Sequence, residues 1–259
     1  MTTVTAERVQ RRTLRVLATG QVLGGVGVGS GIAVGGLIAE EVSGSTALSG
    51  LAQTAAVLGA AVAALPMARL MSARGRRPGL TAGYAVAAAG AVVVVLGSVV
   101  GSFVLVLLGS AMLGAGTATN LQSRYAATDL AAPAHRARAL SIVVWATTVG
   151  VVLGPNLTGP GADVARGLDL PTLTGPLLFS LVAFALAAAT ILSTLRPDPL
   201  LEARRRLGID PGAHAPHASF AEAMRAVLAS RRAVLGLAAI ALGHTVMVSV
   251  MVMTPVHMR

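Results

Sequence analysis

Long apolar runs alternate with short charged connections along almost the whole chain. Seven runs contain no Asp, Glu, Arg or Lys, namely 16–39, 48–68, 79–97, 103–122, 139–157, 175–195 and 233–253. About 20 apolar residues form a helix long enough to cross the roughly 30 Å hydrocarbon core of a bilayer. A helix on a water-soluble domain carries a polar stripe, whereas these runs are apolar on all sides. The pattern predicts an all-α, polytopic membrane protein.

Composition supports this interpretation and limits the partners that we expect. Of the 259 residues, 54% are hydrophobic and only 12% are charged, against about 25% charged in ordinary soluble domains. The net charge of +10 comes from arginines dispersed among the connections, which favours the lipid bilayer over nucleic acid as partner. The chain has no lysine for a retinal Schiff base and no cysteine for disulfides, thiol catalysis or metal binding.

The arginines also predict the orientation of the chain. Eighteen of the 20 fall in the N-terminal tail or in alternate connections, and only Arg166 and Arg259 fall on the other side. Because cytoplasmic loops carry the excess of positive charge, the N-terminus is expected to be cytoplasmic. Tyr84 and Tyr125 are then predicted at cytoplasmic span ends. Abundant Arg and Ala without Lys are typical of a GC-rich bacterium, so a bacterial inner membrane is expected.

Charge and hydropathy divide the chain into four parts. We expect a cytoplasmic tail (1–15), a six-helix bundle (16–195), a cytoplasmic linker (196–232) and a seventh membrane helix (233–259). Within the linker, Ser219 and Glu222 form a capping box before a short amphipathic helix predicted to lie on the membrane surface. His214 and His217 have no third ligand nearby, so neither a metal nor a cofactor is predicted.

The first apolar run is rich in glycine. A dinucleotide-binding loop would need a preceding strand and a later acidic residue, whereas this segment is an uninterrupted apolar run behind arginines. Gly20 and Gly24, and Gly27, Gly31 and Gly35, are spaced four apart and share a helix face, which allows another backbone to approach closely. Two interpretations remain open: packing alone, or a helix that also bends or slides during transport.

Two sequence motifs narrow the class further. The second and third runs are joined by MARLMSARGRRPG, and the fifth run contains VGVVLGPNLTG, where a proline weakens the helix. With these motifs the chain resembles the major facilitator superfamily (MFS) of secondary transporters. The first is similar to the family's signature between helices 2 and 3, and the second to the helix 5 motif of its drug and proton antiporters. The matching residues are Gly75, Arg76 and Arg77, and Gly150, Gly154, Pro155 and Gly159.

The match is incomplete in two places. Ala68 and Ser72 stand where the family has a glycine and the acidic residue of a cytoplasmic charge relay. Asp129, beside Arg124 on the same membrane side, is our hypothesis for a substitute partner of the loop arginines. In the fourth run Gly114 and Gly116 fit, but Ser110 stands where many members have an arginine tied to proton coupling.

The resemblance implies alternating access between two six-helix halves, with substrate near the bilayer midplane. The chain matches one half, a linker and one further helix, so we expect a truncated product or fragment. The implied activity is secondary transport of a small molecule, with efflux of drug-like or amphipathic compounds favoured, and it is not enzymatic. The alternatives are a non-transporting membrane scaffold and an intramembrane enzyme using Ser30, which lacks a convincing base. Substrate, coupling ion and oligomeric state stay open.

Polar side chains within apolar runs are the candidates for substrate contact or coupling. They are few, and for the amides interhelical hydrogen bonding is an equal alternative. His244 is the group in mid-run that titrates near neutral pH, which makes it the candidate for proton coupling. The candidates are Gln21, Gln53, Asn120, Gln122, Asn156 and His244.

Overall fold

The fold is described by a computed structural model covering residues 3–209 and 220–257. Its chain divides into two compact units, Met1–Ala213 and His214–Arg259, which are described separately. No strand occurs among the described residues. Six helical segments are long and apolar enough to cross a membrane, which confirms the first six predicted spans and the all-α class.

Residues 3–209 of the first unit form six long helices, two short ones and three 3-10 turns. The long helices are α1 (Thr3–Ser43), α2 (Ser49–Arg74), α3 (Arg76–Val99), α4 (Phe103–Thr128), α5 (Arg136–Asn156) and α7 (Gly175–Thr194). The short helices are α6 (Thr158–Gly167) and α8 (Pro199–Arg206). The 3-10 turns are η1 (Thr46–Leu48), η2 (Pro133–His135) and η3 (Thr172–Thr174).

The second unit contains α9 (Phe220–Ala229) and α10 (Arg231–His257). Helix α10 includes the seventh apolar run, and its crossing of the membrane stays a prediction. Helix α9 includes the predicted amphipathic segment, on which Met224 and Leu228 are exposed. The proposed cap residue Ser219, like His214 and His217, lies outside the described residues.

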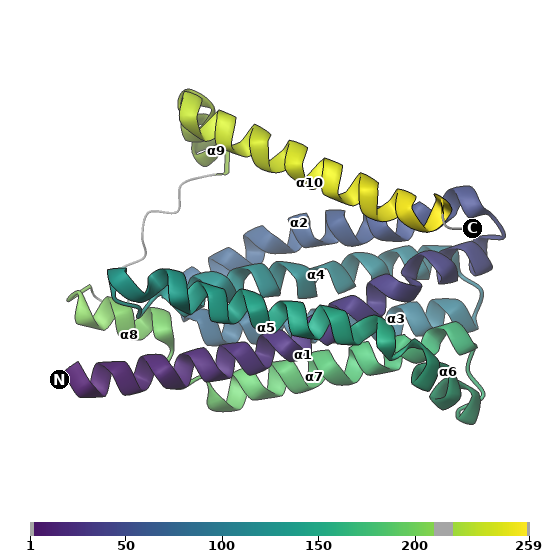
Figure 1. Ribbon diagram of the computed structural model, residues 1–259, viewed down its shortest axis with the longest axis horizontal. Helices are drawn as coiled ribbons and strands as arrows, with labels where there is room; N and C mark the ends of the chain where they lie inside the picture. Colours follow the sequence, from purple (N-terminus) through teal and green to yellow (C-terminus); the bar gives the residue numbers. More distant parts are fainter. Residues whose placement is uncertain (1–2, 210–219, 258–259) are drawn as a thin grey trace. The chain divides into compact units, whose positions relative to one another are not determined.

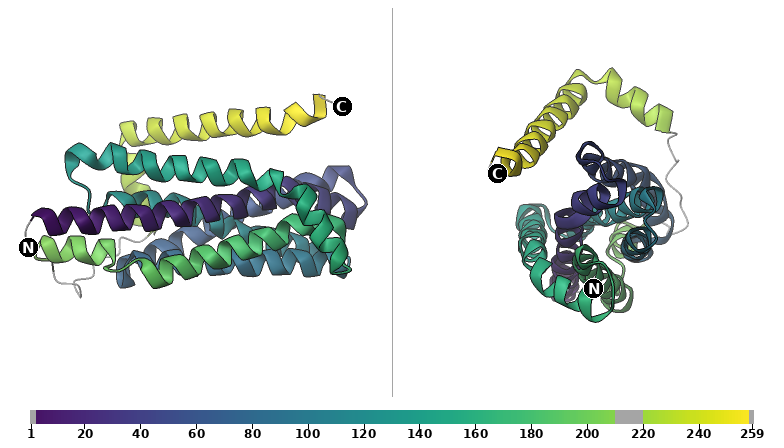
Figure 2. Two further views of the ribbon diagram at one scale, coloured as in Figure 1. Left: turned by 60° about the horizontal axis from the view of Figure 1, so that its bottom comes forward. Right: turned by 90° about the vertical axis from the view of Figure 1, so that its right-hand side faces the viewer.

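The six long helices run side by side in two layers (Figures 1 and 2). One layer has the order α5, α1, α4, α2, and α7 and α3 pack behind α1 and α4. The N-terminus of α1, the α2–α3 turn, the α4–α5 connection and α8 lie at one end, which we call the arginine-rich end. Helix α6 lies at the opposite end (Figure 1).

Helix α1 is longer than its apolar run requires. It has 41 residues, and at about 1.5 Å per residue it is about 60 Å long, twice the thickness of the hydrocarbon core. Most of the segment predicted as an N-terminal tail is therefore helical and continuous with the first span. Arg8, Arg11, Arg12 and Arg15 lie on these additional turns and are exposed.

Tyr84 occupies the centre of the core instead of a span end, which corrects the prediction from the sequence. Its side chain is fully buried, and its ring stacks on Phe184 of α7 with centroids 6.2 Å apart. Helix α3 begins at Arg76, so Tyr84 lies two turns inside it and not at its start. Tyr125 is 62% exposed at the end of α4, where an aromatic ring with a polar tip was expected.

Helices α1 and α5 approach each other with backbone against backbone through glycines. A Cβ atom on Gly25 would lie 2.7 Å from the carbonyl oxygen of Thr147, and one on Gly29 would lie 2.7 Å from that of Val151. From the other side, a Cβ on Gly154 would lie 2.5 Å from the Ser30 nitrogen. Any side chain at these positions would push the two helices apart.

Gly20 and Gly27, which belong to the helix face predicted from the sequence, lie against α7 and not against α5. Gly20 and Gly27 contact the side chains of Ile191 and Phe184 on α7, and a Cβ on Gly35 would meet nothing within 4 Å. The prediction of close helix approach is correct in kind, but Gly25 and Gly29 provide the backbone contact. Their spacing of four matches that of Gly150 and Gly154, and this shared spacing was the missed signal.

Pro155 lies in the last turn of α5. The helix stops at Asn156, and α6 begins at Thr158 after Leu157. The proline has no N–H to donate to the Val151 carbonyl, so one hydrogen bond of the α5 ladder is absent close to the end of the helix. Gly159, the last glycine of the motif, therefore lies in α6, where a Cβ would meet nothing within 4 Å.

We predict that Gly150→Ala destabilises the bundle by about 1–3 kcal/mol, because the new methyl group would collide with the Val22 carbonyl of α1. The matched control is Gly35→Ala, whose methyl group has open space. Thermal unfolding in detergent measures both effects. Equal midpoints for the two variants would contradict the prediction.

Candidate functional site

The α2–α3 turn at the arginine-rich end depends on Gly75. This residue separates the last residue of α2 from the first of α3 and has φ +95°, a conformation that side-chain-bearing residues avoid. A Cβ atom here would also lie 2.5 Å from a carboxylate oxygen of Asp198. Backbone conformation and space both require glycine at this position.

Arg76 and Asp129 form a two-point ion pair that joins the start of α3 to the end of α4. Arg76 Nε donates to Asp129 Oδ2 at 2.8 Å, and Nη2 donates to Oδ1 at 3.2 Å. Their side chains are 16% and 14% exposed, so water screens the pair weakly. The structure thus contains the contact hypothesised from the sequence. Its role in transport stays a prediction.

Arg124 lies close to this region without joining the pair. Its Nε atom is buried and has no hydrogen-bond partner among the described residues. Asp129 bonds to Arg76 and not to its sequence neighbour. The two charge partners named from the sequence are therefore not brought together as a pair.

Asp198 is a second carboxylate at the same turn, and sequence reasoning missed it. One oxygen accepts the backbone N–H of Arg77 at 2.7 Å, and the other accepts those of Leu200 and Leu201 at 3.0 and 3.3 Å. Asp198 thereby caps α8 while it binds the first turn of α3. Its position directly before Pro199 at the start of a helix was the available signal.

Helix α8 makes one more bond to the turn. Arg204 Nη1 donates to the carbonyl oxygen of Ser72 at 2.9 Å. Ser72 stands where the resembled family has its acidic residue, and here its backbone carbonyl receives the arginine. The linker helix is therefore attached to both sides of the α2–α3 turn.

A buried polar cluster joins α1, α3 and α4 farther into the bundle. Gln21 Nε2 donates to the Asn120 carbonyl at 2.7 Å, and the Tyr84 hydroxyl donates to Asn120 Oδ1 at 2.8 Å. Gly24 leaves room for this cluster, since a Cβ there would lie 2.5 Å from Asn120 Oδ1. Gln21 Oε1 is buried without a partner among the described residues.

This cluster favours interhelical hydrogen bonding for two of the amides. Gln21 is 0% exposed and Asn120 is 5% exposed, so neither side chain is accessible to a substrate in this conformation. Their direct contact with substrate stays a prediction that requires the helices to separate.

The other candidates lie apart from the cluster. Gln53 on α2 and Gln122 on α4 are half-buried, and Asn156 is exposed with its Nδ2 bonded to the Val152 carbonyl at 2.7 Å. His244 lies in α10, but its side chain is outside the described residues. The structure therefore brings together Gln21 and Asn120 from this group.

Serine hydroxyls in the spans bond to backbone carbonyls. Ser30 Oγ donates to Gly154 O at 3.2 Å across the α1–α5 contact, and Ser110 Oγ donates to Val106 O at 2.7 Å within α4. Gly114 faces the α2 backbone at Ala56, and Gly116 faces Phe184. These residues support close packing between helices.

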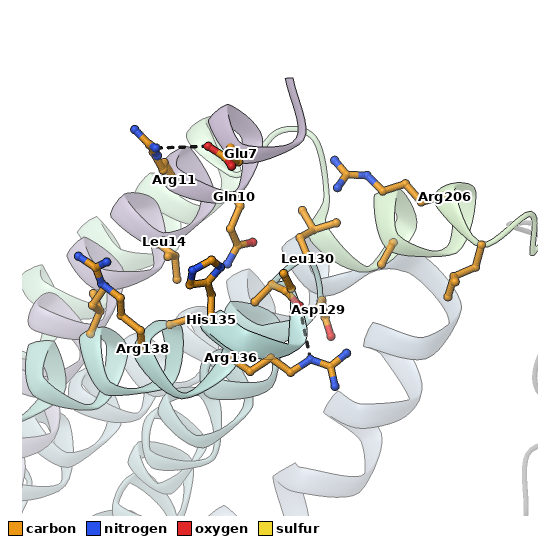
Figure 3. Close-up of a pocket in the computed structure, with 16 residues that line it drawn as sticks. Glu7, Gln10, Arg11, Leu14, Asp129, Leu130, His135, Arg136, Arg138 and Arg206 are labelled. Carbon is orange, nitrogen blue, oxygen red and sulfur yellow. Dashed lines mark hydrogen bonds and ion pairs between the residues drawn. The ribbon is translucent and has the colours of Figure 1, made fainter. Parts of the chain in front are cut away.

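The described residues of the first unit enclose cavities of different character, among them a larger and a smaller one. The larger, about 1080 Å³, opens at the arginine-rich end between α1, the α4–α5 connection and α8 (Figure 3). The smaller, about 430 Å³, lies between α2, α3 and α4 and has an apolar lining that includes Pro66, Met67, Gly83 and Met112. No group of three potential metal ligands occurs in the part of the chain that was described.

Comparison with known proteins agrees with this architecture. The family model of the Major Facilitator Superfamily matches residues 16–259. The chain belongs to this superfamily. This MFS chain is 39% identical over 253 residues to the uncharacterized MFS-type transporter YdeG of Bacillus subtilis, covering 96% of the chain and 57% of the relative.

Two further relatives also match nearly the whole chain with only part of their own length. YddS, another uncharacterized MFS-type transporter of Bacillus subtilis, is 34% identical over 252 residues, which cover 97% of the chain and 57% of the relative. The riboflavin transporter RfnT of Brucella anthropi is 30% identical over 264 residues, covering the whole chain and 61% of the relative. The MFS chain thus spans about three fifths of their length. No solved structure matches it significantly.

We predict that Asp129→Asn destabilises the MFS chain by about 1–3 kcal/mol, because Arg76 would lose its charged acceptor in a partly buried position. Asp163→Asn is the matched control, since its pair with Arg166 is exposed and should contribute less than about 1 kcal/mol. Thermal unfolding in detergent compares the variants. The structural importance of the Arg76 pair is refuted if both variants unfold at the same temperature.

Asp198→Ala is expected to release α8 from the α2–α3 turn. The variant loses the helix cap, which contributes about 1 kcal/mol, together with the bond to Arg77. Trypsin should then cleave within Arg204–Arg206 faster than in the unchanged chain. Asp163→Ala serves as the control, and unchanged cleavage of Asp198→Ala relative to it would contradict the assignment.

Proposed function

We propose that this chain forms one six-helix half, and the first helix of the other half, of a secondary transporter of the bacterial inner membrane. It moves small amphipathic molecules outward by alternating access, with the arginine-rich end in the cytoplasm. Family membership supports the transport class, and the distribution of arginines supports the orientation. Its partners are a small-molecule substrate and the surrounding lipid.

The observation that carries the proposal is the glycine contact between α1 and α5. Gly150 and Gly154 of the helix 5 motif face Gly25 and Gly29 with backbone against backbone. Because no side chains interdigitate there, the two helices can shift along each other without repacking a core. The motif's resemblance to that of drug and proton antiporters supports the outward direction.

Substrate chemistry is supported by one relative and one cavity. The riboflavin transporter RfnT is named for a molecule with a flat aromatic ring system and a polar chain. The apolar cavity between α2, α3 and α4 has a volume within the usual range of about 300–1,000 Å³ for ligand sites. An amphipathic, partly aromatic compound fits both observations.

Proton coupling is the less supported part of the proposal. The six apolar runs of the first unit contain no carboxylate, so a carboxylate-based relay in mid-span has no candidate there. His244 in α10 is the candidate group, since imidazole changes charge near neutral pH. The proposal assigns it a coupling role without contact geometry.

The test is transport into everted membrane vesicles from cells that express the gene. Riboflavin and a fluorescent amphipathic dye should accumulate inside, and a protonophore should abolish accumulation if protons drive it. Gly150→Ala should lose most of the flux while Gly35→Ala keeps it, because only the first substitution obstructs the α1–α5 contact. His244→Ala with unchanged pH dependence would remove that residue's assigned role.

Absence of flux for every probe, from a chain present in the membrane in normal amount, would reject transport and favour a scaffold. Flux that Gly150→Ala leaves unchanged would reject the role given to the glycine contact. Each result bears on a different part of the proposal.

A further inference from the structure

The cavity of about 430 Å³ between α2, α3 and α4 is a narrow slot. Its α2 wall runs from Gly59 to Leu70, a rise of about 17 Å at about 1.5 Å per residue. The volume divided by this length gives a mean cross-section of about 25 Å². A helix with its side chains is about 10–12 Å across. The slot is therefore too narrow for a helix and suits a single hydrocarbon chain or a flat ring system.

The slot is apolar and opens between α2 and α3. Every residue that lines it is a glycine or has an apolar side chain. Two of them are exposed, Val62 of α2 at 75% and Val86 of α3 at 43%, and they mark the opening. Leu70, at one end of the slot, lies one turn before Arg74, the last residue of α2 at the arginine-rich end. A molecule whose apolar part fills the slot can thus keep its polar part outside, close to that end.

The inner wall of the slot is a methionine side chain that lies over a glycine. A Cβ atom on Gly83 of α3 would lie 2.5 Å from Met67 Cε, so the thioether occupies the space of a missing side chain. Met71, one turn later on α2, lies over Gly79 in the same way. Met71 is fully buried and does not line the slot, whereas Met67 does. Of these two methionines, an occupant of the slot would contact Met67.

Met67 has adjustable neighbours and space beside it. An unbranched thioether reaches several rotamers at low cost, so it can fill a gap of changing shape. Met112 of α4 lines the same slot and is a second thioether. Sulfur makes favourable contacts with aromatic rings, often at the ring edge. Two thioethers in the wall therefore favour an aromatic occupant over a saturated chain of the same width.

We propose that this slot binds the flat aromatic part of an amphipathic molecule and that Met67 sets the size of the ring system it accepts. The rings enter between Val62 and Val86 and lie against the thioethers of Met67 and Met112. The inference rests on the proposed transport of amphipathic molecules and states where such a molecule is held. An acyl chain of the surrounding lipid also fits the width, but it gains no sulfur contact with a ring, so the aromatic compound should displace it.

The test measures binding to the purified chain in phospholipid nanodiscs by fluorescence titration, with empty nanodiscs of the same lipid as background. The probes are a naphthalene and a pyrene compound with the same charged chain. Ala82→Phe should weaken naphthalene binding about tenfold or more, because its ring occupies the slot. Ala85→Phe is the matched control, since Ala85 is exposed on the same helix outside the slot, and it should bind as the unchanged chain does. Unfolding midpoints verify that both variants are folded.

The role of Met67 has its own readout, the ratio of the two dissociation constants. Met67→Ala should shift the preference toward the larger pyrene compound about tenfold, because the slot extends into the space of the lost thioether. Met67→Leu keeps the volume of the side chain and should keep the ratio. Met71→Ala removes the same side chain from a closed position beside Gly79, so it should lower the unfolding midpoint and leave the ratio unchanged.

Three results would overturn the proposal. Equal weakening by Ala82→Phe and Ala85→Phe would show that the probe partitions into lipid beside the helix. A saturated alkyl compound with the same charged chain that binds as tightly as the naphthalene compound would show a groove for acyl chains only. The same ratio in Met67→Ala as in the unchanged chain would reject the role of Met67.

Binding is measured without transport, so failure of the slot and failure of the proposed function are distinguishable. Slot binding that follows the predicted pattern, from a chain without flux in vesicles, would reject transport and keep the binding site. Flux of the naphthalene compound that Ala82→Phe leaves unchanged would keep transport and reject the slot as the place where the molecule is held.

Discussion

The structure depends on the absence of water in the hydrocarbon core. A backbone there must satisfy its own hydrogen bonds, which imposes continuous helices on the apolar runs. Lipid tails are as apolar as leucine, so burial of apolar side chains does little to hold one helix against another, and close packing of small residues takes over. The contact of Gly25 and Gly29 with Gly150 and Gly154 is an example of such packing, because the α1 and α5 backbones touch there. Where polar groups enter the bundle, as at Gln21, Tyr84 and Asn120, they bond to one another across three helices.

At the arginine-rich end, carboxylates join the helices of the bundle. The α2–α3 turn lacks the acidic residue of the family pattern, since Ser72 occupies that position. Two acids from distant parts of the chain approach the turn instead, Asp129 from the end of α4 and Asp198 from the start of α8. A family motif that is incomplete in sequence is therefore surrounded by carboxylates in space. The turn, α4 and the linker helix are consequently joined at one end of the bundle.

Sequence reasoning was most successful where one physical cause dominated. Exclusion of charge from lipid placed all six described spans. It failed where the outcome depended on which helix is the neighbour. Spacing showed that glycines on α1 share faces, but it could not show that Gly25 and Gly29 face α5 while Gly27 faces a phenylalanine. Tyr84 was misplaced for the same reason, because its burial requires Phe184, a hundred residues later. Asp198 was missed because its partner Arg77 lies 121 residues earlier in the sequence.

The length of α1 has a mechanical consequence. The helix is a single rod, unbroken from Thr3 to Ser43 and without proline. Its glycine contact with α5, at Gly25 and Gly29, falls close to the midpoint of that rod. A tilt about this fulcrum displaces the two tips of α1 in opposite directions. In the proposed alternating access, such a tilt would narrow the bundle at one end and widen it at the other.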